Sequence, residues 1–318
     1  MGHALQWHDA FREAYGHTPL YLSAADVEQE GAILPAFVVR RPFQGPGVCS
    51  MPFLDTGGPC SQTAAISRQL VAELVRRAAN IGARAVELRC IESLDIEIPA
   101  NLDKVTMILP LPDDPQVLWQ GLKAKVRNLV RKAERAGLTV EFGGMELLDA
   151  FYAVLAVNMR ELGSPVHSKA FFGAILQAFD QRARLALIRK DTTVVGGLLA
   201  IEFNGTLSVP WASSLREYFR LSPNMLLYWQ TLRQACLDGV SRFDFGRSSR
   251  GVGTYRFKKQ WGAEEVQLYW YDIPVKNKSI RKMSGNSSGG KLVTSIWKHL
   301  PLQMTMWLGP KIRKYLTQ

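Results

Sequence analysis

An internal duplication constrains the fold of this 318-residue chain more than any other feature of its sequence. In the first half, a strand-like run over residues 20–26 leads through a polar turn into a second apolar run over residues 31–39. In the second half, residues 185–191 lead through a short turn into residues 194–201 in the same way. Apolar, β-branched runs joined by a short turn predict a β-hairpin. The sequence therefore predicts one hairpin in each half of the chain.

Each predicted hairpin is followed by an amphipathic helix and then by a further strand. The helices are expected at residues 61–80 and 223–237, and the strands at residues 85–89 and 242–245. Each helix stops close to a glycine, Gly82 or Gly239, where a left-handed C-terminal cap is natural. The same order twice predicts a duplicated α+β unit. We expect two tandem domains, residues 1–108 and 109–275, each with a mixed central sheet flanked by helices.

A basic helix is predicted between the two halves. Asp114 can cap its start, Pro115 suits the first helical position and Gly137 can close it, which predicts one helix over residues 113–137. Six cations lie on this helix and only Glu134 opposes them: Lys123, Lys125, Arg127, Arg131, Lys132 and Arg135. An ordinary solvated face and a docking surface for phosphates both account for such a pattern. Lys123, Arg127 and Arg131 are the candidate donor-phosphate patch.

The net charge of +11 does not by itself indicate a nucleic-acid-binding protein, because of where the charge lies. Nine of the 39 Lys and Arg residues fall in residues 276–318, which contain no Asp or Glu, and the remaining 30 nearly balance the 28 acidic residues. Residues 276–291 are rich in Ser, Gly and Asn, which is typical of a flexible linker. Residues 296–316 mix aromatic and aliphatic side chains with cations. They form a basic amphipathic tail that either contacts a membrane surface or packs back on the body.

The four cysteines show neither CxxC spacing nor a histidine at ligand spacing, so we expect reduced, buried thiols and no metal site. No run approaches the roughly 20 apolar residues that span a bilayer, and the first residues do not resemble a signal peptide. The expected location is cytoplasmic, with a peripheral contact at the inner face of the membrane if the tail is interfacial.

Residues 243–262 carry the densest group of candidate functional side chains. Phe243 and Phe245 point to one side of a strand and Asp244 to the other. After the strand come Arg247, Ser248 and a Gly-Val-Gly turn, whose backbone N–H groups can approach an anion closely. Two lysines then follow within an aromatic stretch: the segment reads Tyr255, Phe257, Lys258, Lys259 and Trp261. This pattern fits an anion or carbonyl site, and it equally fits a basic loop with aromatic core anchors.

At these residues the sequence resembles the Fem-type transferases, especially short bacterial members without a coiled-coil arm. FDFGRS over residues 243–248 and GTYRFKKQWG over residues 253–262 are similar to that family's signature region. Similar motifs begin at Ser50, at Asn158 and at Ser222, in the family's order. The resemblance covers roughly residues 5–275. It implies two acetyltransferase-like (GNAT) domains, and members usually carry an extra segment ahead of the position of Trp7, so the first domain is expected to lack its first strand.

The resemblance implies transfer of an activated aminoacyl or acyl group to an amine of a cell-envelope precursor, related to peptidoglycan or exopolysaccharide. Lys258 stands where the family engages the donor phosphate and the reacting carbonyl. Amine attack on an ester or thioester builds a tetrahedral oxyanion, which a fixed ammonium stabilises. No Ser–His or Cys–His pair is apparent, which favours direct attack. The predicted catalytic set is Lys258, Phe257 and Asp244; the predicted substrate-binding set is Arg247, Ser248, Tyr255, Lys259, Trp211 and Asn224.

The donor is left between two classes, and no tightly bound cofactor is expected. Users of acetyl-CoA need a glycine-rich turn before the second helix, so that backbone N–H groups bind the diphosphate. Here that turn reads Arg220-Leu221-Ser222-Pro223-Asn224, in which Pro223 lacks an N–H and no glycine is present. This favours aminoacyl-tRNA over an acyl-CoA or acyl-carrier donor. A non-catalytic envelope-assembly subunit that retains the fold is the third alternative. His167 has a structural explanation beside a functional one, and Asp244 either accepts the amine proton or pairs with Arg247.

Overall fold

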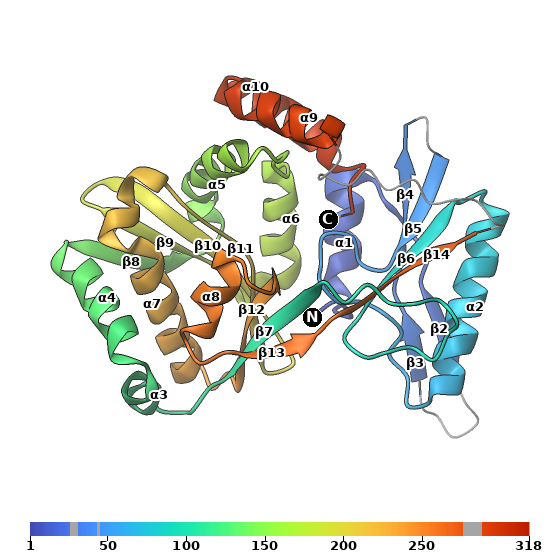
Figure 1. Ribbon diagram of the computed structural model, residues 1–318, viewed down its shortest axis with the longest axis horizontal. Coiled ribbons are helices and arrows are strands. Elements are labelled where there is room, and N and C mark those ends of the chain that lie inside the picture. Colours follow the sequence, from blue (N-terminus) through green and yellow to red (C-terminus); the bar gives the residue numbers. More distant parts are fainter. Residues whose placement is uncertain (26–30, 43–44, 276–287, 318) are drawn as a thin grey trace. The chain divides into compact units, whose positions relative to one another are not determined.

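The structure is a computed structural model that describes residues 1–25, 31–42, 45–275 and 288–317 (Figure 1). The chain forms two compact units, each described here by itself. Unit 1 comprises Met1–Thr106, Val266–Ser284 and Lys314–Gln318, and unit 2 comprises Met107–Glu265 and Gly285–Arg313. The predicted linker at 276–291 falls almost entirely outside the described residues. The units therefore differ from the two contiguous domains expected from the sequence, because a late strand and the last residues return to unit 1.

Unit 1 is built on a five-stranded sheet of order β1-β4-β5-β6-β14, with a separate β2–β3 hairpin. Its elements are α1 (Gln6–Tyr15), β1 (Thr18–Pro19), β2 (Leu22–Ala25), β3 (Gly31–Leu34), β4 (Phe37–Arg41), β5 (Gly45–Cys49), α2 (Ala64–Asn80), β6 (Ala85–Cys90) and β14 (Tyr269–Pro274). Helix α2 packs on β2, β3 and β6, and it begins after Thr63, whose side chain accepts a hydrogen bond from the Ile66 N–H. Leu70, Leu74 and Ala78 on α2 line the core of this unit.

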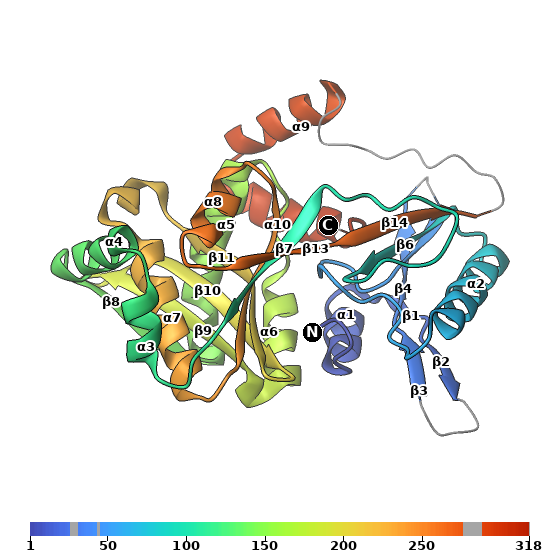
Figure 2. The same ribbon diagram turned by 60° about the horizontal axis from the view of Figure 1, so that its bottom comes forward.

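Unit 2 is built on a seven-stranded sheet of order β13-β7-β12-β11-β10-β9-β8. The strands of this sheet are β7 (Lys104–Pro110), β8 (Leu138–Gly143), β9 (Ala183–Lys190), β10 (Thr193–Phe203), β11 (Thr206–Ser214), β12 (Arg242–Ser249) and β13 (Glu264–Gln267). The first three residues of β7 and the last two of β13 fall within the bounds of unit 1. Its helices are α3 (Pro115–Gly121), α4 (Ala124–Arg135), α5 (Leu148–Leu162), α6 (Lys169–Phe179), α7 (Pro223–Leu237), α8 (Gly253–Lys259), α9 (Ser288–His299) and α10 (Leu302–Arg313). Helices α5 and α6 cover one face of the sheet, and α4, α7 and α8 cover the other (Figures 1 and 2).

Each unit contains two parallel strands joined by a helix, and in each the strands pair only briefly. In unit 2, the β11–β12 register runs from Thr206 opposite Arg242 to Ser208 opposite Asp244, although β11 continues to Ser214 and β12 to Ser249. In unit 1, β5 and β6 pair only at Val48–Val86 and Cys49–Glu87. In unit 2 the pairing therefore ends although both strands continue, whereas in unit 1 the paired residues are the last two of β5, and the following Ser50 N–H still donates to the Glu87 carbonyl at 2.8 Å.

The duplication predicted from the sequence is present, but in a different register. By connectivity, β4-β5-α2-β6 of unit 1 corresponds to β10-β11-α7-β12 of unit 2. The predicted hairpins both exist, as β2–β3 and β9–β10, yet the first is a two-stranded sheet of its own. The prediction matched the more apolar hairpin of unit 1 instead of the β4–β5 pair, whose strand Gly45–Cys49 carries two glycines and a proline and therefore has a weak strand pattern.

The predicted helix over residues 113–137 is two helices. The cap by Asp114, which accepts a hydrogen bond from the Gln116 N–H at 2.7 Å, is confirmed, as is a closing glycine at Gly137 with φ +73°. Helix α3 ends at Gly121, and Leu122 and Lys123 then take extended ψ angles of 144° and 142°. Glycine is a weak helix former, so the break falls where the helix costs most.

Residues 288–313 pack on unit 2 through α5. Trp297 and Thr305 are buried, and Gly163 and Gly309 lie so close to Thr294 and Val166, respectively, that an added Cβ atom would clash. Of the two alternatives for the tail, packing on the body therefore holds for the inward faces of α9 and α10. No helix among the described residues is long and apolar enough to span a bilayer.

Candidate active site

The end of β12 brings Asp244 and Lys258 together through the backbone of Gly246. The Gly246 N–H donates to the Asp244 carboxylate at 2.8 Å, and the Lys258 ammonium donates to the Gly246 and Arg247 carbonyls, each at 2.8 Å. Gly246 has φ +74°, a conformation that glycine adopts without strain. Lys258 is 8% exposed, so its charge lies inside the unit at the point where β11 and β12 have diverged.

Phe257 has a packing role in this structure. Its ring meets Tyr228 of α7 edge-on at 5.1 Å between centroids and Trp261 at 6.3 Å. Tyr228 in turn stacks on Phe245 of β12 at 5.5 Å. Phe257 therefore anchors the short helix α8 in the aromatic core, and that anchor fixes the neighbouring Lys258. These contacts give Phe257 a packing role, and its catalytic role stays a prediction.

Tyr255 and Lys259 lie in a separate, exposed cluster. The Tyr255 hydroxyl donates to Glu265 at 2.7 Å, and the Lys259 ammonium donates to the Tyr255 hydroxyl at 3.2 Å. Arg250 approaches the same carboxylate at 3.3 Å. The tyrosine hydrogen bond lowers the pKa of Glu265, with Arg250 and Lys259 adding to the effect. The structure thus divides the predicted lysine pair, with Lys258 inside and Lys259 at the surface.

Ser248 is buried near the end of β12. Its side chain is 4% exposed, and its hydroxyl has no hydrogen-bond partner among the described residues. A buried hydroxyl without a partner costs about 1–3 kcal/mol, which is unusual unless a ligand or water completes it. Arg247, next to it, is half-buried. A role of Ser248 in substrate binding therefore stays a prediction, and its buried hydroxyl, without a partner in the described part of the chain, supports it.

The facing strand β11 carries Trp211 and a short polar network. Trp211 packs edge-on against His167, Phe171 and Phe172, with centroid distances of 5.6, 5.6 and 5.4 Å. Further along, the Ser213 hydroxyl donates to Asn158 at 3.2 Å and the Ser214 hydroxyl to Asn224 at 2.5 Å. Trp211 therefore lies on β11 and Asn224 contacts it. Asn158 begins one of the Fem-like motifs, whereas no sequence motif singles out Ser213 or Ser214.

His167 belongs to the core of unit 2. Its ring stacks on Phe171 at 4.7 Å, and the Arg313 guanidinium donates to its Nε2 atom at 3.0 Å. Burial, with the Arg313 charge adding to it, holds the pKa of His167 well below its ordinary value. The ring is therefore neutral at physiological pH and accepts the arginine hydrogen bond, which matches the structural explanation.

The turn before α7 differs from a diphosphate-binding turn. Ser222 has φ +61°, Pro223 lacks an N–H, and the Met225 N–H donates to the Ser222 carbonyl at 3.0 Å. At the position of a diphosphate, Ser222 is thus in a strained backbone conformation, Pro223 has no N–H to donate, and the Met225 N–H is already hydrogen-bonded. A helix N-terminus binds phosphate through several free N–H groups, which this turn does not supply in the usual way.

The α4 segment presents its cations to solvent on the face opposite its buried stripe. Val126, Val130 and Ala133 are buried, whereas the candidate phosphate residues Lys123 and Arg131 are exposed and Arg127 is half-buried. Arg127 donates to the Gln120 carbonyl at 3.2 Å, and the Arg131 guanidinium lies over the Trp119 ring at 5.5 Å. Among the described residues, none of the six cations of this segment forms an ion pair.

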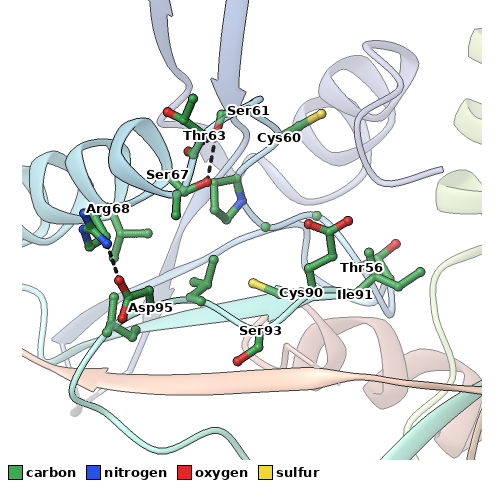
Figure 3. A pocket seen from close by; sticks show the side chains of 18 of the residues that line it. Thr56, Cys60, Ser61, Thr63, Ser67, Arg68, Cys90, Ile91, Ser93 and Asp95 are labelled. Atoms are coloured by element: carbon green, nitrogen blue, oxygen red, sulfur yellow. Dashed lines mark hydrogen bonds and ion pairs between the residues drawn. The ribbon is translucent and has the colours of Figure 1, made fainter.

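Unit 1 contains a pocket of about 380 Å³ that the sequence reasoning missed (Figure 3). It lies at the start of α2 beside the carboxyl end of β6, and the carboxyl ends of strands are a common place for ligands in sheets with parallel strands. Ser61 and Ser67 hydrogen-bond each other at 2.8 Å, and Arg68 pairs with Asp95. The available signal was Gly57-Gly58, whose N–H groups both donate to the Arg89 carbonyl.

Three of the four cysteines are buried, as predicted, and Cys60 is exposed at the rim of that pocket. Burial raises the pKa of Cys49 and of Cys90 to about 12, so neither thiol is a nucleophile at neutral pH. No group of His, Cys, Asp or Glu side chains within the described part of the chain is arranged to hold a metal ion.

Comparison with known proteins defines the class. Residues 120–259 match the family described as Acetyltransferase (GNAT) domain. The structure of FemX covers 85% of this chain with 91% of its own, at 14% identity and a TM-score of 0.66. The C-terminal domain of an Agrobacterium fabrum protein assigned as a lysylphosphatidylglycerol synthetase gives 84% and 87% coverage, 14% identity and a TM-score of 0.57. No curated protein sequence matches the chain.

A tandem GNAT protein from the clavulanic acid biosynthesis pathway covers 86% of this chain with 95% of its own, at 13% identity and a TM-score of 0.52. Residues 120–259 thus contain a region that matches the GNAT domain family, and the whole chain has an α+β fold of two GNAT-like units. The resemblance to Fem-type transferases is confirmed at the level of the fold.

Proposed function

We propose that the chain is an N-acyltransferase that moves an aminoacyl group from tRNA to an amine of a cell-envelope precursor. The observation that carries the choice of donor is the basic face of α4, whose six cations form no ion pair among the described residues. Unpaired cations in a row suit a phosphate backbone, because each phosphate contact releases condensed counterions. One structural neighbour is assigned as a lysylphosphatidylglycerol synthetase. That name describes an amino acid attached to a membrane lipid, which supports an aminoacyl group as the transferred group and an envelope molecule as the acceptor.

The α7 turn supports the same choice of donor. An acyl-CoA would place its diphosphate at the N-terminus of α7, where Pro223 has no N–H and Met225 already donates to Ser222. Acyl-CoA is therefore the alternative donor, favoured by the GNAT match and opposed by this turn.

Lys258 is the group we propose for stabilising the reaction. Attack of the acceptor amine on the donor ester forms the C–N bond and places negative charge on the former carbonyl oxygen. Collapse of this intermediate breaks the C–O bond to the tRNA ribose, and the amine proton, taken up by a side-chain base, is returned to the departing ribose oxygen. The ammonium of Lys258, held at the end of β12 by Gly246 and Arg247, supplies positive charge in a water-poor setting. Asp244, fixed by the Gly246 N–H, is the proposed proton acceptor.

Binding of the two donor classes distinguishes the alternatives. We expect saturable, salt-dependent binding of aminoacyl-tRNA in a filter assay and no shift of the melting temperature with acyl-CoA. Tight CoA binding without tRNA binding would reverse the assignment of the donor. Absence of both would favour a non-catalytic assembly role.

We also propose a contact between α9–α10 and an anionic membrane surface. Leu292, Val293 and Ile296 on α9 are more than half exposed, as is Trp307 on α10, whose ring lies 3.4 Å from the Lys311 ammonium. Residues 288–317 contain no Asp or Glu. Exposed apolar and aromatic side chains among cations alone are complementary to a negatively charged headgroup layer.

A further inference from the structure

Residues 314–317 lie in unit 1 as a turn at Lys314 and Tyr315 followed by two residues without regular structure, and they are bound largely through their backbone. The Thr317 carbonyl accepts hydrogen bonds from the Phe53 N–H at 2.8 Å and from the Arg89 guanidinium. The Thr317 hydroxyl donates to Glu87 at 2.6 Å, and Arg41 donates to the Tyr315 carbonyl at 3.3 Å. Main-chain recognition combined with one side-chain contact is how proteins bind short peptides.

The receiving site is built from buried charge. Arg89 is 1% exposed, donates to the Leu54 carbonyl at 2.6 Å, and lies over the Trp270 ring at 4.9 Å. Glu87 pairs with Arg41 at 2.6 Å. Burial raises the pKa of Glu87, but Arg89, Arg41 and the Thr317 hydroxyl outweigh it and hold the pKa below its ordinary value. Burying charged side chains costs free energy of desolvation. The cluster of Arg89, Glu87 and Arg41 around residues 314–317 therefore indicates a site that recognises this segment as well as a stabilising contact.

The loop that closes this site is strained. Met51 and Phe53 have φ values of +55° and +68°, which side-chain-bearing residues adopt at a cost of about 1–3 kcal/mol each. Phe53 uses that conformation to donate its N–H to Thr317. The loop follows β5 directly, and the Ser50 hydroxyl at its start accepts a hydrogen bond from the Arg89 N–H at 2.9 Å. Backbone strain of this kind clusters at binding sites, and here it faces the bound segment.

A cavity of about 190 Å³ continues from the same charged residues. Glu87, Arg89 and Trp270 line it together with Asn101, Lys104 and Asp272. All of these residues belong to unit 1. The polar surface that receives the segment therefore extends beyond the part that residues 315–317 cover, which leaves room for a longer ligand.

We infer that this site in unit 1 binds a short peptide, and that residues 315–317 are its intramolecular occupant. The ligand is a peptide with a carbonyl for Arg89 and Phe53 and a hydroxyl or ammonium donor for Glu87. If an external peptide competes with residues 315–317, its identification as the peptide of the acceptor rests on the proposed function. The existence of the peptide site does not depend on that function. A tethered occupant acts at an effective concentration of about millimolar, so an external peptide binds well only after the segment leaves.

The test uses a variant that lacks residues 314–318 and a fluorescein-labelled pentapeptide of the removed sequence, Lys-Tyr-Leu-Thr-Gln. We expect saturable binding by fluorescence anisotropy to the shortened chain, and at least tenfold weaker binding to the full chain. Replacing the threonine of the peptide by valine should weaken binding about tenfold, because a hydrogen bond to a charged group is lost. No donor or acceptor is present, so failure here leaves the proposed function untouched.

If the shortened chain is poorly stable, its melting temperature provides a second measurement of peptide binding. The unlabelled pentapeptide should then raise its melting temperature in proportion to the logarithm of peptide concentration, since only the folded state binds. The valine peptide should raise it less. Equal binding to the full and shortened chains, or neither anisotropy change nor melting shift with the shortened chain, would overturn the inference.

Discussion

Lys258 has two roles that can be separated by experiment. Its ammonium fixes two carbonyls at the end of β12, and under the proposed function it also meets the oxyanion. A merely structural lysine would affect folding stability but leave the turnover of folded molecules unchanged. A residue that acts on the reacting oxygen changes the turnover number at constant fold.

Replacing Lys258 by methionine keeps the length of the side chain and removes the charge. We expect the turnover number to fall about 10²–10³-fold, as when an oxyanion donor is lost. Two carbonyls also lose a partner, at about 1–3 kcal/mol each, so the melting temperature should fall. Lys169→Met, at an exposed lysine, is the matched control. A turnover number unchanged in the folded fraction of Lys258→Met would show that the lysine is structural.

His17 predicts a pH dependence of unit 1. Its ring is 5% exposed, and burial, with Lys314 adding to it, lowers its pKa to about 4. The unfolded chain binds this proton from about pH 6.5 downward, whereas the folded chain binds it only near pH 4. Stability is therefore full above pH 6.5 and declines by roughly 3 kcal/mol as the pH falls to 4.

His17→Phe should remove that part of the pH dependence, because a phenyl ring can keep the contacts with Tyr15 and Phe53. Chemical denaturation between pH 4 and 7 measures the difference between the two proteins. Parallel stability curves for the two proteins would show that His17 does not titrate as described.

Sequence reasoning could locate the candidate residues but not their directions. Successive side chains on a helix point about 100° apart. Tyr255, Phe257, Lys258 and Lys259 are therefore neighbours in sequence that divide, on α8, between an exposed cluster, the aromatic core and the end of β12. Asp244 and Lys258 meet only because Gly246 adopts a left-handed conformation, which a strand pattern does not reveal.

At the scale of elements, α4 is the one whose sequence most directly predicts a partner. Its cations repeat along one side and its apolar residues along the other, and the structure keeps them apart. The same pattern does not say whether phosphates bind there, since solvated helices look alike. Removing charge at defined positions decides between the two.

The triple variant Lys123→Gln, Arg127→Gln and Arg131→Gln should weaken tRNA binding uniformly across tRNA sequences. Each lost phosphate contact reduces the slope of log K against log salt by about 0.7–0.9, so we expect a decrease of about 2. The control is Arg12→Gln, Arg76→Gln and Lys169→Gln, which removes the same charge elsewhere. An identical salt slope in both triple variants would make α4 a solvated face only.

The bounds of elements were predictable where local signals were strong. Helix α7 has the predicted range, and α2 starts only three residues later than expected. The break after Gly121 was not predictable from periodicity, because Leu118, Leu122 and Val126 keep helical spacing across it. The register of the duplication failed for a related reason: pairing between strands is non-local, and local pattern does not choose the partner.

At the scale of the whole molecule, the duplication predicted two α+β units and the Fem-type resemblance implied that they are GNAT-like, but neither gave the residues that make up each unit. Val266–Ser284 return to unit 1 because β14 pairs antiparallel with β6, from Tyr269 opposite Cys90 to Pro274 opposite Ala85. The same holds for residues 314–317, whose contacts with Arg89 and Glu87 span more than 200 positions. Such long-range contacts leave no trace in a single sequence.

The outer faces of α9 and α10 predict a surface property of the molecule. Vesicles with phosphatidylglycerol should bind the protein at low salt, and phosphatidylcholine vesicles should not. Leu292→Ser with Ile296→Ser should reduce sedimentation with vesicles more than tenfold, since each buried aliphatic side chain contributes about 1.5–3 kcal/mol. The control pair is Leu5→Ser with Ile81→Ser, which are also exposed. Equal loss in both pairs, or no vesicle binding at all, would remove the proposed membrane contact.

The central claim is that an activated aminoacyl ester on tRNA is the donor. Its most direct test is a single-turnover assay with tRNA charged with a radiolabelled amino acid and an amine-bearing peptidoglycan precursor, with the product identified by mass spectrometry. We predict an acceptor whose mass increases by one aminoacyl residue, an amide bond stable to mild base, and no product with Lys258→Met. Transfer from an acyl-CoA instead, with the charged tRNA left intact, would contradict the account.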